Sequence, residues 1–388
     1  MQDQPKPEAG GRGGVAPAPA GQEGGRGGPA AAQAARGGAG RGRGAAQGPG
    51  IVFDSDMGRN IDAALALAML YSLGGKGHAI AVGVSSSNLQ AAAFCDAVGR
   101  FYAGDPAARS TGNSGVLPVG LAEDGPKLAN AAMLAGPLGM TKPDGTPAFR
   151  HDVKSAIDTA DVTVLYRNAM LTQKDGEGIV VLAGPATNLA RALANKRYAD
   201  VFAVKAGLLV VAAGAYPEGP PDARIKADIA AARQLFANWP TPIVAVGTEV
   251  GNAVRYPGHS IETDFSWAPL HPVVEAYRAF QPPPYDALGQ AMAAVLYAAN
   301  QKAGYFRLSE PGTITVQDDG RTRFASAAGG KHRYLMVDPA QKEQVLKAYT
   351  ELAATKPTPP AGRGFRPPQA NQAEGAAGDK PAGAAEGR

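Results

Sequence analysis

Hydrophobic positions in the central part of the chain fall into two kinds of segment that alternate. Short apolar runs rich in Val and Ile, without alternating polar positions, occur at 51–54, 79–85, 178–183, 207–213 and 242–248. Such runs are typical of strands that are covered on both faces of a sheet. Segments predicted to be helical lie between them, at 62–73, 89–103, 156–173, 186–195, 227–237 and 286–299. This alternation predicts an α/β fold with a mostly parallel, doubly wound sheet.

A late segment has a different pattern. Residues 312–316 form a short β-prone run, a turn follows at Asp318-Asp-Gly320, and a second run covers 321–324. This spacing predicts a β-hairpin. We expect it to be a small C-terminal appendage on the main sheet.

Composition divides the 388 residues into three parts. Residues 1–49 and 358–388 consist largely of small and polar residues, which bury too little apolar surface to offset chain entropy, so both are predicted to be disordered tails. Residues 50–357 are predicted to form the folded domain. Arg-Gly units in the first tail resemble RNA-binding tails, but no aromatic residue precedes Phe53. A flexible spacer is therefore the favoured interpretation.

The number of cysteines and the length of the apolar runs exclude several classes of protein and of site. A single cysteine, Cys95, excludes a disulfide within the chain and a cysteine-based zinc site. No apolar run approaches the ~18 residues of a membrane span. No signal peptide is visible after Met1, and we interpret the chain as a mature form of an extracytoplasmic, periplasmic or secreted protein. The sequence of the precursor would test this interpretation.

The segment that follows the first strand carries three acidic residues, Asp54, Asp56 and Asp62. Carboxylates at the carboxyl end of a strand repel one another unless positive charge or hydrogen-bond donors lie between them. A hard cation such as Ca²⁺ or Mg²⁺, a polyhydroxylated ligand, or both would meet this need. Doubly wound sheets also bind their ligands at this edge. The alternative is that Asp62 caps a helix and the others are turn residues.

The motif Asp54-Ser-Asp56-Met-Gly58-Arg-Asn60-Ile-Asp62-Ala-Ala-Leu-Ala-Leu resembles the signature of the inosine/uridine-preferring nucleoside hydrolases, D-x-D-x-G-x-D-x-D-D-A-L-A-L. The resemblance extends over roughly residues 50–357, and its exported bacterial branch is the most similar. Further matching segments are 84–88, 165–167, 178–189, 239–251 and 284–286.

The resemblance implies hydrolysis of an N-glycosidic bond. In that family a Ca²⁺ ion holds the ribose hydroxyls and a water, and an aspartate accepts a proton from the water as it attacks the anomeric carbon. The transition state has oxocarbenium character. Asp56 would be metal ligand and general base, Asp286 the second carboxylate ligand, and the backbone carbonyl of Ala183 a further ligand. Asp62 would bind a ribose hydroxyl and add to the metal site.

The resemblance also assigns the remaining site residues. Asn88, Asp222 and Arg224 would contact the sugar, and Tyr285 would protonate the leaving group. Structural roles remain open for two residues, since Asn88 is also a plausible turn residue and Asp286 a plausible helix cap. Arg224 and Arg59 could bind an anionic ligand. We favour the alternative that they pair with Asp222 and Asp62 and replace lost metal charge.

Two departures from the family motif weaken the prediction of calcium. Asn60 replaces an aspartate, and Ala63 stands where the family has a second adjacent aspartate that binds Ca²⁺ directly. Because Ca²⁺ takes 6–8 oxygen ligands, losing a carboxylate predicts weaker binding.

Hydrolysis of a ribonucleoside or related N-riboside is thus the first hypothesis for function. The alternative is a catalytically impaired descendant that binds a ribosyl or other polyol ligand without metal, and a role carried by the tails ranks last. The expected partner is a small molecule rather than a membrane or a nucleic acid, and family resemblance suggests a homo-oligomer.

Overall fold

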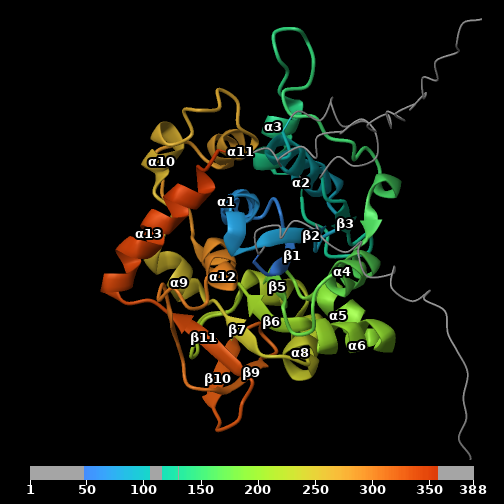
Figure 1. Cartoon of the computed structure of the whole chain (residues 1–388), viewed down its shortest axis with the longest axis vertical. Helices are drawn as coiled ribbons and strands as arrows, with labels where there is room; N and C mark the ends of the chain where they lie inside the picture. The colour runs from blue at the N-terminus through green and yellow to red at the C-terminus, as the bar shows by residue number, and fades with distance from the viewer. Residues whose placement is uncertain (1–47, 105–115, 130, 357–388) are drawn as a thin grey trace, which may run out of the picture. The chain divides into compact units, whose positions relative to one another are not determined.

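The computed structural model describes residues 48–104, 116–129 and 131–356. The predicted tails lie almost entirely outside these residues. The described chain has the predicted architecture, a mostly parallel central sheet with helices on both faces (Figure 1). None of the helices within the described ranges is long and apolar enough to cross a membrane.

In the described part of the chain, the sheet has eleven strands in the order β10-β9-β11-β7-β6-β5-β1-β2-β3-β4, with β8 paired to β11. Pairing is parallel from β4 across to β7 and between β7 and β11, and antiparallel where β8, β9 and β10 join. The strands are β1 (Gly50–Ser55), β2 (His78–Val84), β3 (Val119–Leu121), β4 (Ala160–Asp161), β5 (Gly178–Ala183), β6 (Ala206–Val211), β7 (Ile243–Ala245), β8 (Arg307–Leu308), β9 (Gly312–Val316), β10 (Thr322–Ser326) and β11 (His332–Met336).

Helices cover both faces of the sheet. The helices are α1 (Ile61–Tyr71), α2 (Leu89–Tyr102), α3 (Ala132–Gly139), α4 (Val162–Leu171), α5 (Thr187–Ala194), α6 (Lys196–Lys205), α7 (Ala223–Ala227), α8 (Ile229–Asn238), α9 (Thr248–Ala253), α10 (Gly258–Thr263), α11 (Pro272–Phe280), α12 (Gln290–Ala299) and α13 (Pro339–Ala353). Alternate residues of β1 enter opposite cores. Ile51 and Phe53 pack toward α1, α2 and α12, whereas Val52 packs toward α4, α5 and α8.

The five predicted strands and the C-terminal hairpin are present, and the hairpin extends the main sheet through β11. Two predicted helices are shorter than expected. The segment 156–173 yields α4 only from Val162, because the carboxylate of Asp161 caps it by accepting from the backbone N–H groups of Thr163 (3.0 Å) and Val164 (2.9 Å). The last predicted helix begins at Gln290 rather than residue 286.

On the two sides of β1, successive strands of the chain are added in opposite directions across the sheet. This strand lies between β2, which leads to β3 and β4, and β5, which leads to β6 and β7. The carboxyl end of such a switch strand opens into a crevice between the two halves of the sheet. The backbone N–H of Asp56 donates to the carbonyl of Ala183 at the end of β5, at 3.2 Å. The chain therefore brings the acidic motif to this switch point.

One buried histidine gives the fold a predicted pH dependence. Burial lowers the pKa of His271 to about 3, and its ring lies against those of Phe101 and Phe265. Since an unfolded histidine titrates near pH 6.5, its stabilising contribution is complete above that pH and is lost toward pH 3. Between these two pH values the free energy of unfolding should fall by about 1.4 kcal/mol per pH unit because of His271, and His271→Asn should remove this dependence.

Urea denaturation of both proteins between about pH 7 and about pH 4 measures this slope. The stability difference between them should shrink steadily as the pH falls. A difference that is the same at every pH would show that His271 does not titrate in this way.

Candidate functional site

Two carboxylates of the acidic motif are buried at the carboxyl edge of the sheet. Asp56 follows β1 directly, and Asp62 lies in the first turn of α1. Asn60 caps α1, and its side-chain oxygen accepts from the backbone N–H of Asp62 at 3.4 Å. Both carboxylates have no solvent exposure. Because two buried negative charges repel strongly at low dielectric, they require compensation.

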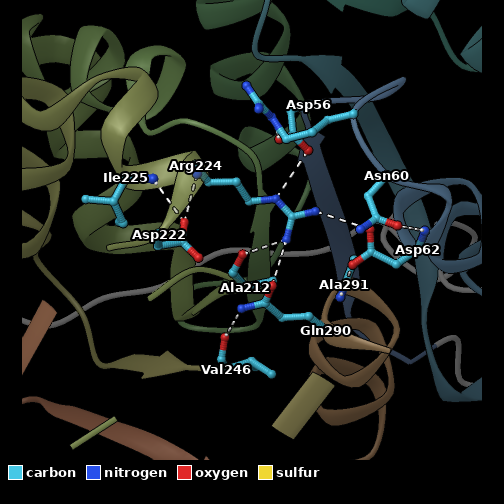
Figure 2. A network of polar contacts seen from close by, with 11 residues as sticks. Asp56, Asn60, Asp62, Ala212, Asp222, Arg224, Ile225, Val246, Gln290 and Ala291 are labelled. Carbon is cyan, nitrogen blue, oxygen red and sulfur yellow. Dashed lines mark hydrogen bonds and ion pairs between the residues drawn. The ribbon is translucent and has the colours of Figure 1, made fainter. Parts of the chain in front are cut away.

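The guanidinium of Arg224 lies between these two carboxylates (Figure 2). Its Nε donates to Oδ1 of Asp56 at 3.2 Å, and its Nη2 donates to Oδ1 of Asp62 at 3.3 Å. Arg224 comes from the short helix α7, which Asp222 caps by accepting from the backbone N–H groups of Arg224 (2.8 Å) and Ile225 (3.1 Å). The capped helix therefore directs the guanidinium across the end of the sheet.

Two further oxygens complete the surroundings of the guanidinium. Nη1 of Arg224 donates to the carbonyl of Ala212, just after β6, at 3.0 Å, and to Oε1 of Gln290 at 3.2 Å. Gln290 is held in turn by its own donation to the carbonyl of Val246 at 2.9 Å (Figure 2). Arg224 thus uses four of the five N–H donors of a guanidinium. Its side chain is 6 % exposed.

The remaining carboxylate oxygens also face protein donors. Nε of Arg59 lies 2.7 Å from Oδ2 of Asp56, in an ion pair that does not have the geometry of a hydrogen bond. The backbone N–H of Ala291, in the first turn of α12, donates to Oδ2 of Asp62 at 3.0 Å. All four oxygens of the two carboxylates therefore have a cationic or N–H partner. Two arginines balance the two negative charges.

Burial and the neighbouring charges shift the pKa values of Asp56 and Arg224 in opposite directions. Burial raises the pKa of Asp56, and the positive charges of Arg224 and Arg59 oppose that rise. Burial alone would lower the pKa of Arg224, but Asp56 and Asp62 raise it above its ordinary value. The guanidinium therefore stays protonated.

Asp54 lies behind this network. Burial raises the pKa of Asp54 to about 7, opposed by the hydrogen bond from Nδ2 of Asn188, which donates to its Oδ1 at 3.3 Å. Asn188 also donates to the carbonyl of Val84 at 3.3 Å. Asp54 therefore links β1 to β2 and α5.

A cavity of about 360 Å³ opens against the network. Its lining includes Arg59, Asn60, Asp222, Arg224, Thr248 and Gln290. The side chain of Arg59 is 32 % exposed and lines this cavity, while its Nε is paired with Asp56. This volume is within the range of small-molecule sites.

A larger cavity of about 660 Å³ lies between α8 and β9 and includes His332. His332 begins β11, so this cavity lies at the amino ends of the parallel strands β7 and β11. The carboxyl edge carries the buried charges, and we place the candidate site there.

Sequence comparison identifies the family. A family model described as inosine-uridine preferring nucleoside hydrolase matches residues 51–348. The chain belongs to the inosine-uridine preferring nucleoside hydrolase family. No curated protein gives a sequence match. The family is one of enzymes that hydrolyse N-glycosidic bonds, which indicates a small-molecule nucleoside as the type of ligand.

Solved structures confirm the nucleoside hydrolase fold. A plant nucleoside hydrolase is 21 % identical with a TM-score of 0.58, over 79 % of this chain and 99 % of its own. A purine-preferring ribonucleoside hydrolase from Gardnerella vaginalis is 17 % identical with a TM-score of 0.57, over 79 % and 99 %. The inosine-uridine preferring enzyme from Bacillus anthracis is 15 % identical with a TM-score of 0.56, over 79 % and 99 %.

The arrangement does not fit the calcium site that the family motif implies. Within residues 48–104, 116–129 and 131–356, no three acidic, histidine or cysteine side chains are grouped as a metal site would need. The oxygens of Asp56 and Asp62 are already taken by Arg224, Arg59 and Ala291. Calcium prefers 6–8 oxygens, and here a guanidinium fills the space between the carboxylates.

Asp286, predicted as the second carboxylate ligand, lies apart from the network. It is exposed, and its Oδ1 accepts from the backbone N–H of Gly258 at 2.9 Å. The physical reason is the late start of α12, which places Gln290 rather than Asp286 against Arg224. Among the described residues, no hydrogen bond or ion pair joins Asp286 to Asp56 or Asp62, so its role as a metal ligand stays a prediction.

Tyr285, predicted as a proton donor, makes structural contacts. Its hydroxyl donates to the carbonyl of Tyr277 at 2.7 Å, and the two rings stack with centroids 4.1 Å apart. Burial and the neighbouring Tyr277 raise the pKa of Tyr285. Among the described residues, no hydrogen bond or ion pair joins it to Asp56, Asp62 or Arg224. Proton donation at neutral pH is thus disfavoured.

The other predicted sugar ligands divide into two groups. Asn88 caps α2, since its Oδ1 accepts from the backbone N–H groups of Gln90 (2.9 Å) and Ala91 (3.3 Å). Asp222 caps α7 with one oxygen and also lines the cavity. Gln290 was not predicted, and its signal in the sequence is a polar residue at the start of an apolar helical segment.

Proposed function

We propose that the chain binds a small ribosyl or related polyol ligand in the cavity beside Arg59, and that Arg224 replaces calcium behind that cavity. The observation that carries the proposal is the guanidinium of Arg224 between Asp56 and Asp62. A fixed cation at this position neutralises the carboxylates without a metal. Membership of the nucleoside hydrolase family supports the part of the proposal that concerns binding of a sugar.

The groups that line the cavity suit a polyhydroxylated ligand. Arg59 has N–H donors on both terminal nitrogens beyond its ion pair with Asp56. Asp222 uses Oδ1 for its helix cap, which leaves Oδ2 as an acceptor. Asn60 uses its oxygen for α1, which leaves its NH₂ as a donor. Adjacent hydroxyls of a ribose both donate and accept, so this mixture of donors and acceptors matches them.

The buried carboxylates have a positioning role in this proposal. Asp56 holds Nε of Arg59 and thereby fixes the direction of its terminal nitrogens. Asp62 and Gln290 hold Arg224, which in turn holds Asp56. We derive no hydrolytic step through calcium, because the described carboxylates do not form its site.

Hydrolysis of an N-riboside is the second candidate, and one observation favours it beyond family membership. Burial raises the pKa of Asp56, and a carboxylate with a raised pKa is a better proton acceptor. Asp56 has no solvent exposure, so this reaction would require Arg59 or Arg224 to move away.

Calorimetric titration with ribose, ribonucleosides and sugar alcohols, in the presence of EDTA, tests the proposal. We expect at least one of these ligands to bind, with an affinity that added calcium leaves unchanged. Arg59→Ala should weaken that binding at least tenfold, because it removes the donors at the cavity wall.

Asp222→Asn is the matched variant, since an asparagine keeps the helix cap while removing the charge. It should weaken binding severalfold with little change in melting temperature. Absence of binding by every polyol would contradict the proposal. Release of free base from a nucleoside in EDTA would favour the second candidate instead.

A further inference from the structure

We infer that the cavity of about 660 Å³ between α8 and β9 is a second ligand site, which binds a small molecule through a compact anionic group, a phosphate or a carboxylate. Its volume is within the range of small-molecule sites. It lies at the amino ends of β7 and β11, whereas the cavity beside Arg59 opens at the carboxyl edge of the sheet. The inference therefore does not depend on the proposed function.

The cavity forms where β9 and β11 separate. These strands pair only at Gly312 and His332, and α8 packs against β9 (Figure 1). The turn that leads into β11 closes a further side and contributes Gly329 and Gly330 to the lining. A Cβ on Gly330 would lie 2.3 Å from the carbonyl oxygen of Gly312, so only glycine allows the turn to approach β9 this closely.

Two cationic side chains line the cavity, and its described lining includes no carboxylate. Arg233 donates through Nε to the carbonyl of Val316 at 3.0 Å and pairs through Nη2 with Asp318, which leaves the two N–H groups of Nη1. Lys331 donates to the carbonyl of Pro240 at 3.3 Å, which leaves two of its three donors. Both cations can therefore bind a further anion.

His332 adds a directed hydrogen-bond donor. Its Nδ1 accepts from the backbone N–H of Ile314 at 2.9 Å, and burial together with Lys331 lowers its pKa. The ring is therefore neutral at neutral pH and carries its proton on Nε2. Nothing else in the described chain bonds to Nε2, although the residue is only 6 % exposed. Since buried polar groups are normally paired, an acceptor on a ligand is the expected partner.

The turn before β11 supplies backbone donors as well. Gly329 has a φ of 79°, and Gly330 closes the turn by donating to the carbonyl of Ala327 at 3.0 Å. The backbone N–H groups of Gly329 and Lys331 make no hydrogen bond to any described residue. Turns with free N–H groups of this kind form concavities that bind anions. Charged donors and N–H groups thus line one cavity, which suits an oxyanion with several lone pairs.

Apolar side chains line much of the remaining surface. Phe236 and Trp239 come from the end of α8 and the residue that follows it, and Ile314 and Val316 come from β9. A bare phosphate would leave this surface in contact with water. We therefore expect the ligand to carry an apolar or aromatic body next to its anionic group.

Calorimetric titration of the full chain with inorganic phosphate, phenyl phosphate and benzoate, at constant ionic strength set with potassium chloride, tests the inference. Inorganic phosphate should bind at a single site. Phenyl phosphate should bind at least about tenfold more tightly, because its ring covers the apolar surface. Tighter binding of benzoate than of phenyl phosphate would identify the anionic group as a carboxylate rather than a phosphate.

Variants locate the binding. Lys331→Gln removes a charge, and His332→Asn keeps an acceptor for the N–H of Ile314 while removing the donor at Nε2. Each should weaken binding of phenyl phosphate at least about fivefold. Lys174→Gln, at a lysine that is 82 % exposed, is the matched control and should change nothing. Arg59→Ala should also leave anion binding unchanged, which separates this test from the polyol titration.

Absence of binding by all three anions would overturn the inference, as would binding that Lys331→Gln and His332→Asn leave unchanged. Equal affinity for inorganic phosphate and phenyl phosphate would contradict the role of the apolar surface. Melting temperatures without anion show whether the variants fold. If His332→Asn does not fold, the result for Lys331→Gln decides between the two outcomes.

Discussion

Arg224→Ala is expected to lower the free energy of unfolding by about 3–5 kcal/mol in EDTA at neutral pH. The side chain is 6 % exposed and pairs with Asp56 and Asp62, which are fully buried. Removing one partner of a buried ion pair leaves uncompensated charge, which costs more than the pair itself contributes. Urea denaturation gives the difference in free energy directly.

A second set of variants separates charge from packing. Combining Arg224→Ala with Asp56→Asn and Asp62→Asn removes the three buried charges and leaves only the partly exposed Arg59, and more than half of the lost stability should return. Arg191→Ala breaks an exposed ion pair with Asp124 and should change stability by less than about 1 kcal/mol. A loss below about 1 kcal/mol for Arg224→Ala would mean that the carboxylates do not depend on the guanidinium.

Gly184→Ala is expected to destabilise the protein by about 3 kcal/mol or more. A Cβ at this position would lie 2.6 Å from the backbone nitrogen of Asp56, and closer still to Oγ of Ser85. The first of these atoms directly follows β1, so relief requires movement of the backbone that carries Asp56. Melting temperature and urea denaturation measure the loss, and any polyol binding should fall with it.

Gly139→Ala is the matched control. This glycine ends α3, and a Cβ there would meet no atom within 4 Å. Alanine at an unstrained helical position reduces the entropy of the unfolded chain and stabilises by about 0.4–1 kcal/mol. Equal effects of the two substitutions would contradict the close approach of β5 to Asp56.

The parallel core was predictable because its signal is local. Runs such as 178–183 and 207–213 are long, apolar and β-branched, and they correspond to β5 and β6. Elements whose existence depends on tertiary contacts were missed. The strand β3 has three residues and β4 has two, and neither carries a pattern of its own. Pairing with neighbouring strands at the edge of the sheet stabilises β3 and β4, rather than any preference of their own sequence.

The acidic motif was placed correctly by the sequence, but its partners were not all predictable. The replacement of metal charge by Arg224 was one of two alternatives, since nothing in the sequence fixes where a long side chain points. The last helix was predicted to begin at Asp286, because the motif alignment placed a helix start there. The helix begins at Gln290 instead, and one turn of displacement exchanges a carboxylate for an amide. Site residues on loops therefore need the structure.

A crystal structure of the wild-type protein grown in millimolar calcium tests the central claim most directly. We predict density for the Arg224 guanidinium between Asp56 and Asp62, with no ion bound to either carboxylate. A calcium ion bound to Asp56, with the Arg224 side chain displaced, would contradict the account.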